Sequence, residues 1–140
     1  MIYDLKNSIG YRINQLANKI NTQLNKRLLP YNIGIEQRAI LEIIKFEPHV
    51  NQTTIAQLLG KDKTTISRTL NALEKKELIC RSGFLQDKRS NLLTLTQKAE
   101  TILTQSQEEI TQLREQLHHA LDEEEKLSLF NSLDKINQAL

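Results

Sequence analysis

The sequence predicts a mainly α-helical chain with one short β-hairpin. Gly and Pro together supply only six of the 140 residues, while the helix-favouring residues Leu, Ile, Gln, Glu and Lys are abundant. Along most of the chain, apolar residues recur at intervals of three and four, which is the period of an amphipathic helix. Two short apolar stretches instead flank a polar turn between residues 83 and 90, which is the pattern of a hairpin.

The first fifty residues predict two helices. The first is a single long helix over residues 1–28, which ends before Pro30 because proline cannot continue it. Its apolar positions step by three or four and are Ile2, Leu5, Ile9, Ile13, Leu16, Ile20, Leu24 and Leu28. The second helix starts near Ile35 and ends near Pro48. Its inward positions are Ala39, Ile40, Ile43 and Ile44.

Residues 51–74 predict two more helices joined by a tight turn. The first has an apolar face of Ile55, Ala56, Leu58 and Leu59. Gly60 ends that helix because glycine adopts the left-handed C-cap conformation at little cost. Asp62 is placed to accept the free N–H groups at the start of the next helix. On that helix Ile66, Leu70 and Leu73 share one face.

The hairpin and two further helices complete the chain. Residues 79–82 and 91–95 are the expected strands, and the turn residues between them are Gly83, Asp87 and Ser90. Thr96 caps a fifth helix, and Asp122 with Glu125 forms the N-terminal capping pattern of a sixth. Helix, turn, helix and hairpin in this order make a winged helix-turn-helix. The predicted fold class is therefore a six-helix winged helix-turn-helix, mainly α with a small β-hairpin wing.

The polar face of the fourth helix is the first candidate functional surface. Short polar groups and arginine lie opposite its apolar stripe and suit the major groove, which displays donors and acceptors for each base pair. The alternative is an ordinary amphipathic helix with a solvated face. The tip of the hairpin adds basic residues suited to a phosphate backbone or a minor groove. The candidate DNA-binding residues are Thr53, Lys61, Lys63, Thr64, Thr65, Ser67, Arg68, Asn71, Arg81, Asp87, Lys88 and Arg89.

This segment resembles the MarR family of bacterial transcription regulators. The resemblance rests on the runs Thr64-Thr65-Ile66-Ser67-Arg68, Leu73-Glu74-Lys75-Lys76 and Leu78-Ile79, and on Asp87-Lys88-Arg89 followed by Leu95-Thr96. Asp-x-Arg followed by Leu-Thr is the wing signature of that family. The resemblance implies that Arg89 enters or lines the minor groove and that Asp87 orients a nearby arginine. The alternative for Asp87 is a simple turn former. One departure is Glu77, where the family often has glycine.

The charge of the chain is distributed unevenly. Residues 1–96 contain fifteen Lys and Arg against eight Asp and Glu, whereas residues 97–140 contain four against nine. A positive winged segment followed by a negative C-terminal segment separates a nucleic-acid surface from a region that avoids it. Double-stranded DNA is therefore the expected partner.

The terminal helices predict a homodimer. We expect a single MarR-like chain over residues 1–140, with a DNA-binding lobe at 30–96 and dimerisation helices at 1–29 and 97–140. The terminal apolar stripes exceed what one small lobe can bury, and a two-fold dimer addresses two half-sites one helical turn apart. The alternative is that these helices extend the core of a monomer.

The expected function is a transcription regulator, in particular a repressor that binds a pseudo-palindromic operator. The resemblance also implies release by a small aromatic or anionic effector. Its expected contacts are Tyr11, Arg12, Gln15, Phe46 and His49. The alternative is that Tyr11 and Phe46 belong to the core and Arg12 to the solvated surface. A second functional alternative is a winged-helix protein-interaction module without specific DNA binding.

Catalytic chemistry is not expected. His118 and His119 are adjacent on a helix and point about 100° apart, so they do not form a ready metal site. We find no glycine-rich phosphate loop and no nucleophile–histidine set in the sequence, and we expect no cofactor. Cys80, the single cysteine, is expected to be a small strand residue, with redox sensing as the alternative. Neither a membrane span nor a signal peptide is apparent, which predicts a cytoplasmic protein.

Overall fold

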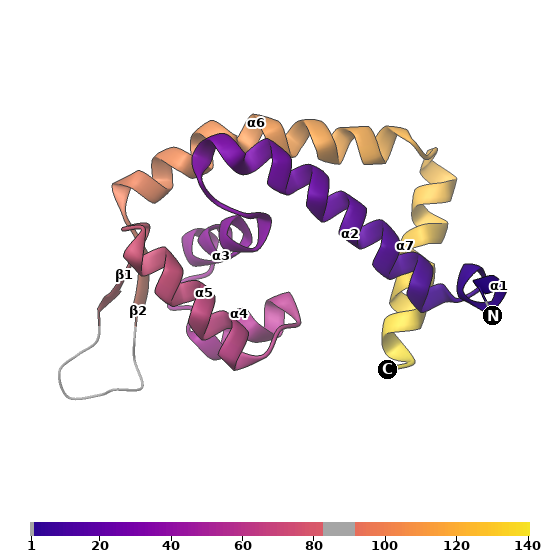
Figure 1. Cartoon of the computed structure of the whole chain (residues 1–140), viewed down its shortest axis with the longest axis horizontal. Helices are drawn as coiled ribbons and strands as arrows, with labels where there is room; N and C mark the ends of the chain where they lie inside the picture. Colours follow the sequence, from indigo (N-terminus) through magenta and orange to yellow (C-terminus); the bar gives the residue numbers. More distant parts are fainter. Residues whose placement is uncertain (1, 83–91) are drawn as a thin grey trace. The chain divides into compact units, whose positions relative to one another are not determined.

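The computed structural model describes residues 2–82 and 92–140. The chain divides into two compact units, Met1–Gln107 and Glu108–Leu140. Figure 1 shows its helices and strands. The described elements are α1 (Ile2–Lys6), α2 (Ile9–Leu28), η1 (Leu29–Tyr31), α3 (Ile35–Phe46), α4 (Gln52–Leu59), α5 (Lys63–Lys75), β1 (Ile79–Ser82), β2 (Leu92–Leu95), α6 (Gln97–His119) and α7 (Glu123–Gln138). The predicted mainly helical fold with a hairpin is confirmed.

The N-terminal helix differs from the single helix that the sequence predicts, because it is interrupted between α1 and α2. Ser8 adopts an extended conformation there, and its Oγ accepts a hydrogen bond from the Tyr11 amide at 3.3 Å. Serine competes for backbone donors in this way and therefore favours a cap over a helix interior. The apolar period continues through the break, so periodicity alone did not reveal it. At the other end, Pro30 lies in the short 3₁₀ turn η1, which follows α2 directly.

The core of the first unit is built from the apolar faces of α3, α4 and α5. Ile66, Leu70 and Leu73 of α5 are fully buried, as predicted. On α4, Ile55 and Ala56 are buried, but Leu58 is 55% exposed, contrary to the predicted apolar face. Successive helical residues turn by about 100°, so Leu58 lies about 160° from Ala56 and falls outside the buried stripe.

The two strands pair antiparallel, with Ile79 opposite Leu95 and Arg81 opposite Leu93. Leu78 and Ile79 are buried, and β1 packs beside α5 while β2 packs beside α3. The strand beginning the hairpin is therefore anchored directly to the second helix of the helix-turn-helix pair. Cys80 lies on β1 and is exposed.

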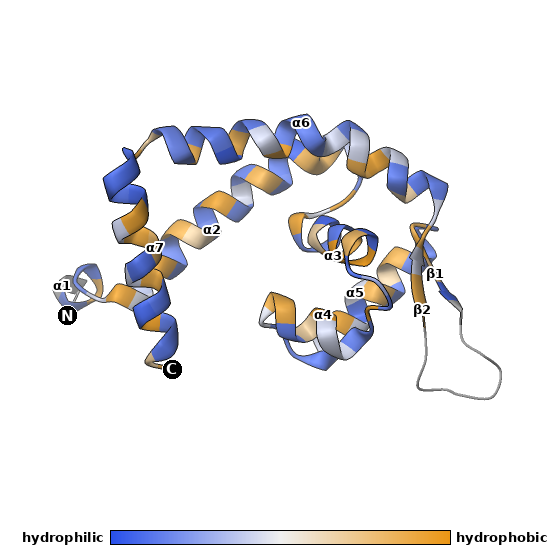
Figure 2. Cartoon of the chain, turned by 180° about the vertical axis from the view of Figure 1, so that it is seen from behind, coloured by the Kyte–Doolittle hydropathy of each residue, from blue (hydrophilic) through white to orange (hydrophobic). Residues whose placement is uncertain are grey.

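The second unit contains the end of α6 and the helix α7. Asp122 caps α7: its Oδ1 accepts from the Glu125 amide at 2.8 Å, and Glu125 Oε1 accepts from the Asp122 amide at 3.1 Å. The predicted capping pattern is confirmed. None of the α7 residues is buried, and Leu127, Phe130 and Leu133 are exposed. Figure 2 shows hydrophobic segments recurring along α2, α6 and α7. Across the described residues, no helix combines the length and apolar character needed to cross a membrane.

Candidate nucleic-acid interface

The turn between α4 and α5 is defined by caps on both sides. Gly60 ends α4 with φ of 63°, in the left-handed region predicted for it. Asp62 begins α5: its Oδ1 accepts from the Thr65 amide at 2.7 Å, and its Oδ2 accepts from the Thr65 hydroxyl at 3.1 Å. Gln52 at the start of α4 donates from Nε2 to the Lys63 carbonyl at 3.1 Å. These contacts fix the start of α5 relative to α4.

The Asp62 cap also has an electrostatic consequence. Hydrogen bonds from the Thr65 amide and hydroxyl hold the pKa of Asp62 below its usual value. The Thr65 hydroxyl is engaged by this carboxylate. In the structure, Thr65 therefore serves the N-terminal cap of α5. Its contact with DNA stays a prediction.

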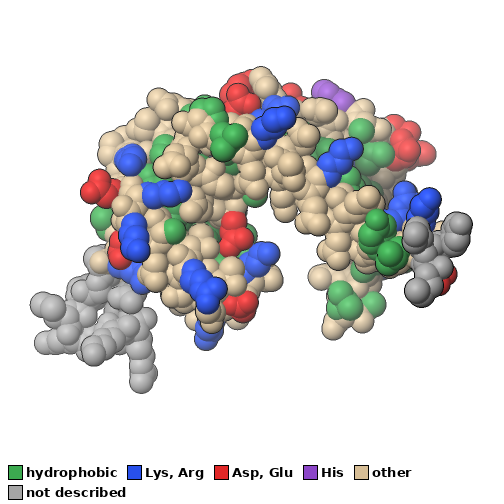
Figure 3. All heavy atoms as spheres, viewed as in Figure 1, with side chains coloured by type: hydrophobic (Ala, Val, Ile, Leu, Met, Phe, Trp, Pro, Cys, Tyr) green, Lys and Arg blue, Asp and Glu red, His purple; other side chains and the backbone are tan. Residues whose placement is uncertain are grey.

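The outer face of α5 is polar and basic. Lys63, Thr64 and Arg68 are exposed, and Ser67 is half-buried. Thr64, Ser67, Arg68 and Asn71 are spaced three or four residues apart, so they lie on one face opposite the buried stripe. Figure 3 shows several Lys and Arg side chains over the surface that carries α5. The structure therefore brings the main sequence-predicted contacts together on one accessible surface. Thr53 on α4 and Lys61 in the turn are also exposed.

Arg81 connects the hairpin to α5. Its Nη2 donates to Asn71 Oδ1 at 3.1 Å, and its Nε lies 3.9 Å from Glu74 Oε2. Nε is buried and has no hydrogen-bond partner within the described part of the chain. The sequence placed Arg81 and Asn71 among separate DNA contacts. In the structure they bind each other, so both are positioned to hold the hairpin against α5, the helix that the sequence predicts to read DNA and that is called the reading helix below.

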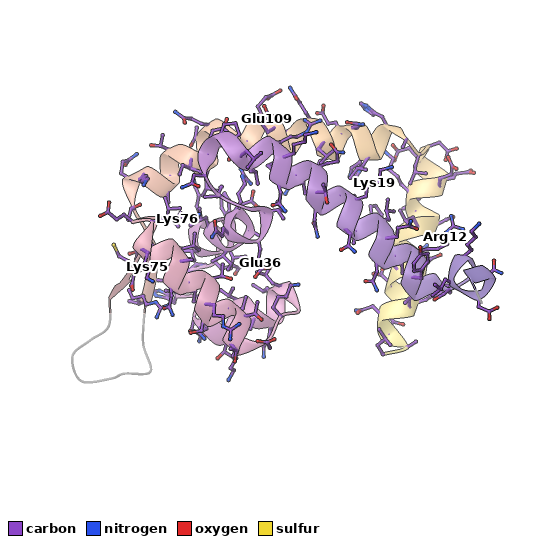
Figure 4. All side chains as sticks on the ribbon, in the orientation of Figure 1. Arg12, Lys19, Glu36, Lys75, Lys76 and Glu109 are labelled. Carbon is purple, nitrogen blue, oxygen red and sulfur yellow. The ribbon has the colours of Figure 1, made fainter. Side chains whose placement is uncertain are left out.

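The C-terminal end of α5 is anchored by contacts that the sequence analysis did not predict. Lys76 Nζ donates to the Asn32 carbonyl at 2.7 Å and to Gln37 Oε1 at 3.0 Å. Glu77 follows with φ of 60°, and its carbonyl accepts from the Thr96 hydroxyl at 2.7 Å. Figure 4 shows Lys75 and Lys76 at this end of α5. The absence of glycine therefore does not prevent a left-handed conformation at Glu77, directly after the C-cap residue Lys76. A lysine at the end of a helix could have indicated a contact of this kind. Its partners Asn32 and Gln37 could not be predicted, because they lie 44 and 39 residues away in the sequence.

A groove of about 790 Å³ separates the C-terminal end of α2 from α5. It is lined by residues that include Asn25, Glu36, Arg68 and Lys76. Glu36 on α3 accepts from the Thr69 hydroxyl of α5 at 3.3 Å, which adds a second support for the reading helix. No sequence pattern pointed to Glu36, because its contact spans 33 residues of chain.

The five residues expected to bind an effector lie in two places. Tyr11, Arg12 and Gln15 are exposed near the N-terminal end of α2, whereas Phe46 and His49 are exposed at and after the end of α3. Figure 4 shows Arg12 far from Glu36 and Lys76. Phe46 borders a cavity of about 310 Å³ together with Glu42, Lys45, Leu103, Thr104 and Gln107. No described contact joins the two groups within the part of the chain that the structure covers. Tyr11 and Phe46 are not core residues, since they are 39% and 71% exposed.

The tip of the wing, with the predicted contacts Asp87, Lys88 and Arg89, lies outside the described residues. Comparison of the amino-acid sequence with known proteins does include these three residues. Residues 33–90 match the model of the MarR family. This segment is MarR-family sequence. The resemblance inferred from the wing motif and the α5 motif is thereby confirmed.

Several solved protein structures share the fold over nearly the whole chain. The DNA complex of MepR from S. aureus is 24% identical with a TM-score of 0.88, covering 95% of this chain and 98% of MepR. A mutant of MarR from E. coli complexed with operator DNA is 26% identical with a TM-score of 0.82, covering 91% and 92%. The repressor CouR, bound to p-coumaroyl-CoA, is 22% identical with a TM-score of 0.84, covering 98% and 96%.

Proposed function

We propose that this protein is a sequence-specific transcription regulator that binds double-stranded DNA. The observation that carries the proposal is the exposed polar and basic face of α5, held next to the wing inside a MarR-family segment. Two similar MarR-type proteins are bound to DNA in their structures, which supports the same activity here. Such a regulator works where the chromosome is, so we also propose a cytoplasmic location.

In this proposal, α5 lies in the major groove. Arg68 reads a base edge, Thr64 and Ser67 contact bases or nearby phosphates, and Lys61 and Lys63 contact phosphates. The wing residues Lys88 and Arg89 follow the phosphate backbone or the minor groove, with Asp87 shaping the tip. Arg81 and Asn71 act mainly by holding the wing to α5.

We further propose that the protein is a repressor that acts as a homodimer on a pseudo-palindromic operator. The support is the apolar surface that one chain leaves exposed on its terminal helices: Ile9 and Leu16 on α2 are 62% and 56% exposed, and Leu127 on α7 is 63% exposed. A second copy of the same chain would cover such stripes through a self-complementary contact. Two-fold symmetry would then present two copies of α5 to two half-sites.

We also propose that a small molecule regulates the protein. A small aromatic or anionic effector would bind near Phe46 and His49, whereas Tyr11, Arg12 and Gln15 lie apart from that cavity on α2 and would form a separate contact. The binding of p-coumaroyl-CoA by CouR supports an effector of this general kind. A thermal-shift screen of aromatic acids, followed by DNA binding in the presence of each hit, tests this. A compound that stabilises the protein without changing its DNA affinity would refute control by that compound.

The test of DNA binding is a titration of fluorescent duplexes at several salt concentrations. A DNA-binding regulator loses affinity linearly on a logarithmic salt scale, with a slope that counts the phosphates neutralised. Arg68→Ala should cost about 1–3 kcal/mol on the preferred duplex, because a bidentate guanine contact is worth that much. Lys19→Ala, a charge-matched change on α2, should leave affinity unchanged. Salt-independent or undetectable binding would favour a protein-interaction module instead.

A further inference from the structure

Arg38 on α3 is a buried charged side chain with four polar partners. It is 1% exposed, although nothing in the sequence distinguished it from a surface arginine. Its Nε donates to Ser106 Oγ at 2.8 Å, and its Nη2 donates to the Leu103 carbonyl and to Gln107 Oε1, both at 3.1 Å. Its Nη1 pairs with Glu42, one turn further along α3.

Three of these four partners belong to a single turn of α6. A guanidinium is planar and presents its donors in a rigid fork, so it specifies both the rotation and the height of the helix turn that it contacts. Apolar side chains of similar volume tolerate small shifts far better. Arg38 therefore fixes α6 on α3 in one register, which an apolar residue at position 38 would not do.

Stability alone does not account for a buried arginine. Apolar replacement of a buried charged network is often neutral or stabilising, because it removes the cost of desolvating the charge. Two of the Arg38 partners also keep another contact or access to water. Ser106 Oγ donates to the Ile102 carbonyl at 2.7 Å, and the Glu42 side chain is 29% exposed. A registry role is the well-attested reason for keeping such a group.

The location of the network gives that registry a consequence. Leu103, Ser106 and Gln107 form the last turn of α6 inside the first unit, and the same helix continues to His119. We propose that Arg38 is a positioning residue that fixes the direction in which α6 leaves the DNA-binding unit. Through the dimer, it thereby sets the spacing of the two reading helices. This inference rests on the proposed homodimeric DNA-binding function.

A nearby contact supplies a matched control. Lys45, also on α3, pairs with Glu100 of α6 at 2.9 Å, but both side chains are about one-third exposed. An exposed pair of this kind contributes little and is not geometrically restrictive. Like Arg38→Met, Lys45→Met removes one positive charge and breaks contact between α3 and α6, but it removes a single exposed ion pair and leaves the buried Arg38 hydrogen bonds in place.

The single cysteine allows the spacing to be measured directly. Cys80 is exposed on β1, so one spin label per chain reports the distance between the two wings of a dimer by double electron–electron resonance. We expect a narrow distance distribution for the parent and for Lys45→Met, and a clearly broader or displaced one for Arg38→Met. Thermal melts of each variant identify a temperature at which all are folded. If Arg38→Met does not fold, Ser106→Ala takes its place and should broaden the distribution in the same way.

DNA binding provides the second readout. The probe is a duplex that the parent selects from a random pool, together with versions in which one base pair is inserted or removed at its centre. Arg38→Met should reduce the preference for the native spacing by about tenfold, whereas Lys45→Met should retain it. A parent-like spacing preference and distance distribution in Arg38→Met or, failing that, Ser106→Ala would overturn the positioning role alone. A parent that selects no duplex, or shows no dipolar signal, would overturn the proposed function and this role with it.

Discussion

Glu77 adopts a backbone conformation that glycine usually occupies. Its φ of 60° lies in the left-handed region, which costs an L-residue roughly 1–2 kcal/mol. Glu77→Gly should therefore stabilise the protein by roughly 1 kcal/mol and raise Tm by about 2–4 °C, measured by thermal denaturation. Lys75→Gly, at the last residue of α5, should instead destabilise the protein, by no more than about 1 kcal/mol. A Tm for Glu77→Gly equal to or below that of the parent would contradict this account.

Asp62 makes the start of α5 sensitive to acid. Its pKa is lowered in the folded protein by the Thr65 amide and hydroxyl, so its contribution to stability is complete above the unfolded pKa near 3.8. That contribution is lost as pH falls from 3.8 through the lower folded pKa. Asp62→Asn keeps a capping side chain but does not titrate.

The prediction compares Tm for the parent and for Asp62→Asn across the acidic range. The advantage of the parent should shrink below pH 3.8 and should be constant above about pH 5. Glu123, whose pKa is also lowered, by the Lys126 hydrogen bond, titrates in both proteins and cancels in the comparison. A constant difference through the acidic range would show that the Asp62 charge does not support the cap.

At the scale of elements, polar contacts join the first strand of the wing directly to the reading helix α5. The hydrogen bond from Arg81 to Asn71 joins β1 to α5, and Glu74 lies beside the same guanidinium. If Arg81 and Asn71 act on DNA through this contact, losing either one has most of the effect of losing both. Arg81→Ala and Asn71→Ala should then be less than additive in DNA-binding free energy.

This double-mutant cycle distinguishes the bracing role from the role that the sequence predicted. Two independent contacts with DNA would give additive losses, within about 0.3–0.5 kcal/mol. Thr64→Ala combined with Arg81→Ala is the matched control, since no described contact joins that pair, and it should be additive. Strict additivity for Arg81 with Asn71 would return both residues to the list of direct DNA contacts.

At the scale of the whole molecule, the apolar surface of α7 predicts that folding and assembly are linked. Leu133→Glu places a charge on the exposed apolar stripe and should convert the dimer to monomer or aggregate, as measured by sedimentation. Ser128→Glu, on the opposite side of α7, should leave the dimer intact. Tm of the parent should rise with protein concentration, because a dimer is favoured by mass action. A concentration-independent Tm with a monomeric mass at micromolar concentration would refute the homodimer.

The sequence by itself determined the elements and most of the reading surface. Periodicity placed α3, α5 and α7, and cap chemistry placed Gly60, Asp62 and Asp122, because each of these signals depends only on residues within one or two helical turns. The same local rules placed Thr64, Ser67 and Arg68 on one face of α5. They missed the break at Ser8, where a capping side chain outweighed the apolar period.

Tertiary structure alone decided which polar residues face one another. Arg38 meets α6 across 65 to 69 residues of chain, Lys76 meets Asn32 across 44, and Arg81 meets Asn71 across the start of the hairpin. A single sequence carries no signal for such pairs, since each residue alone looks like a solvated side chain. Burial makes such contacts energetically important, because a charged group removed from water loses its hydration and needs polar partners within the protein. Only the tertiary structure can hold those partners in place.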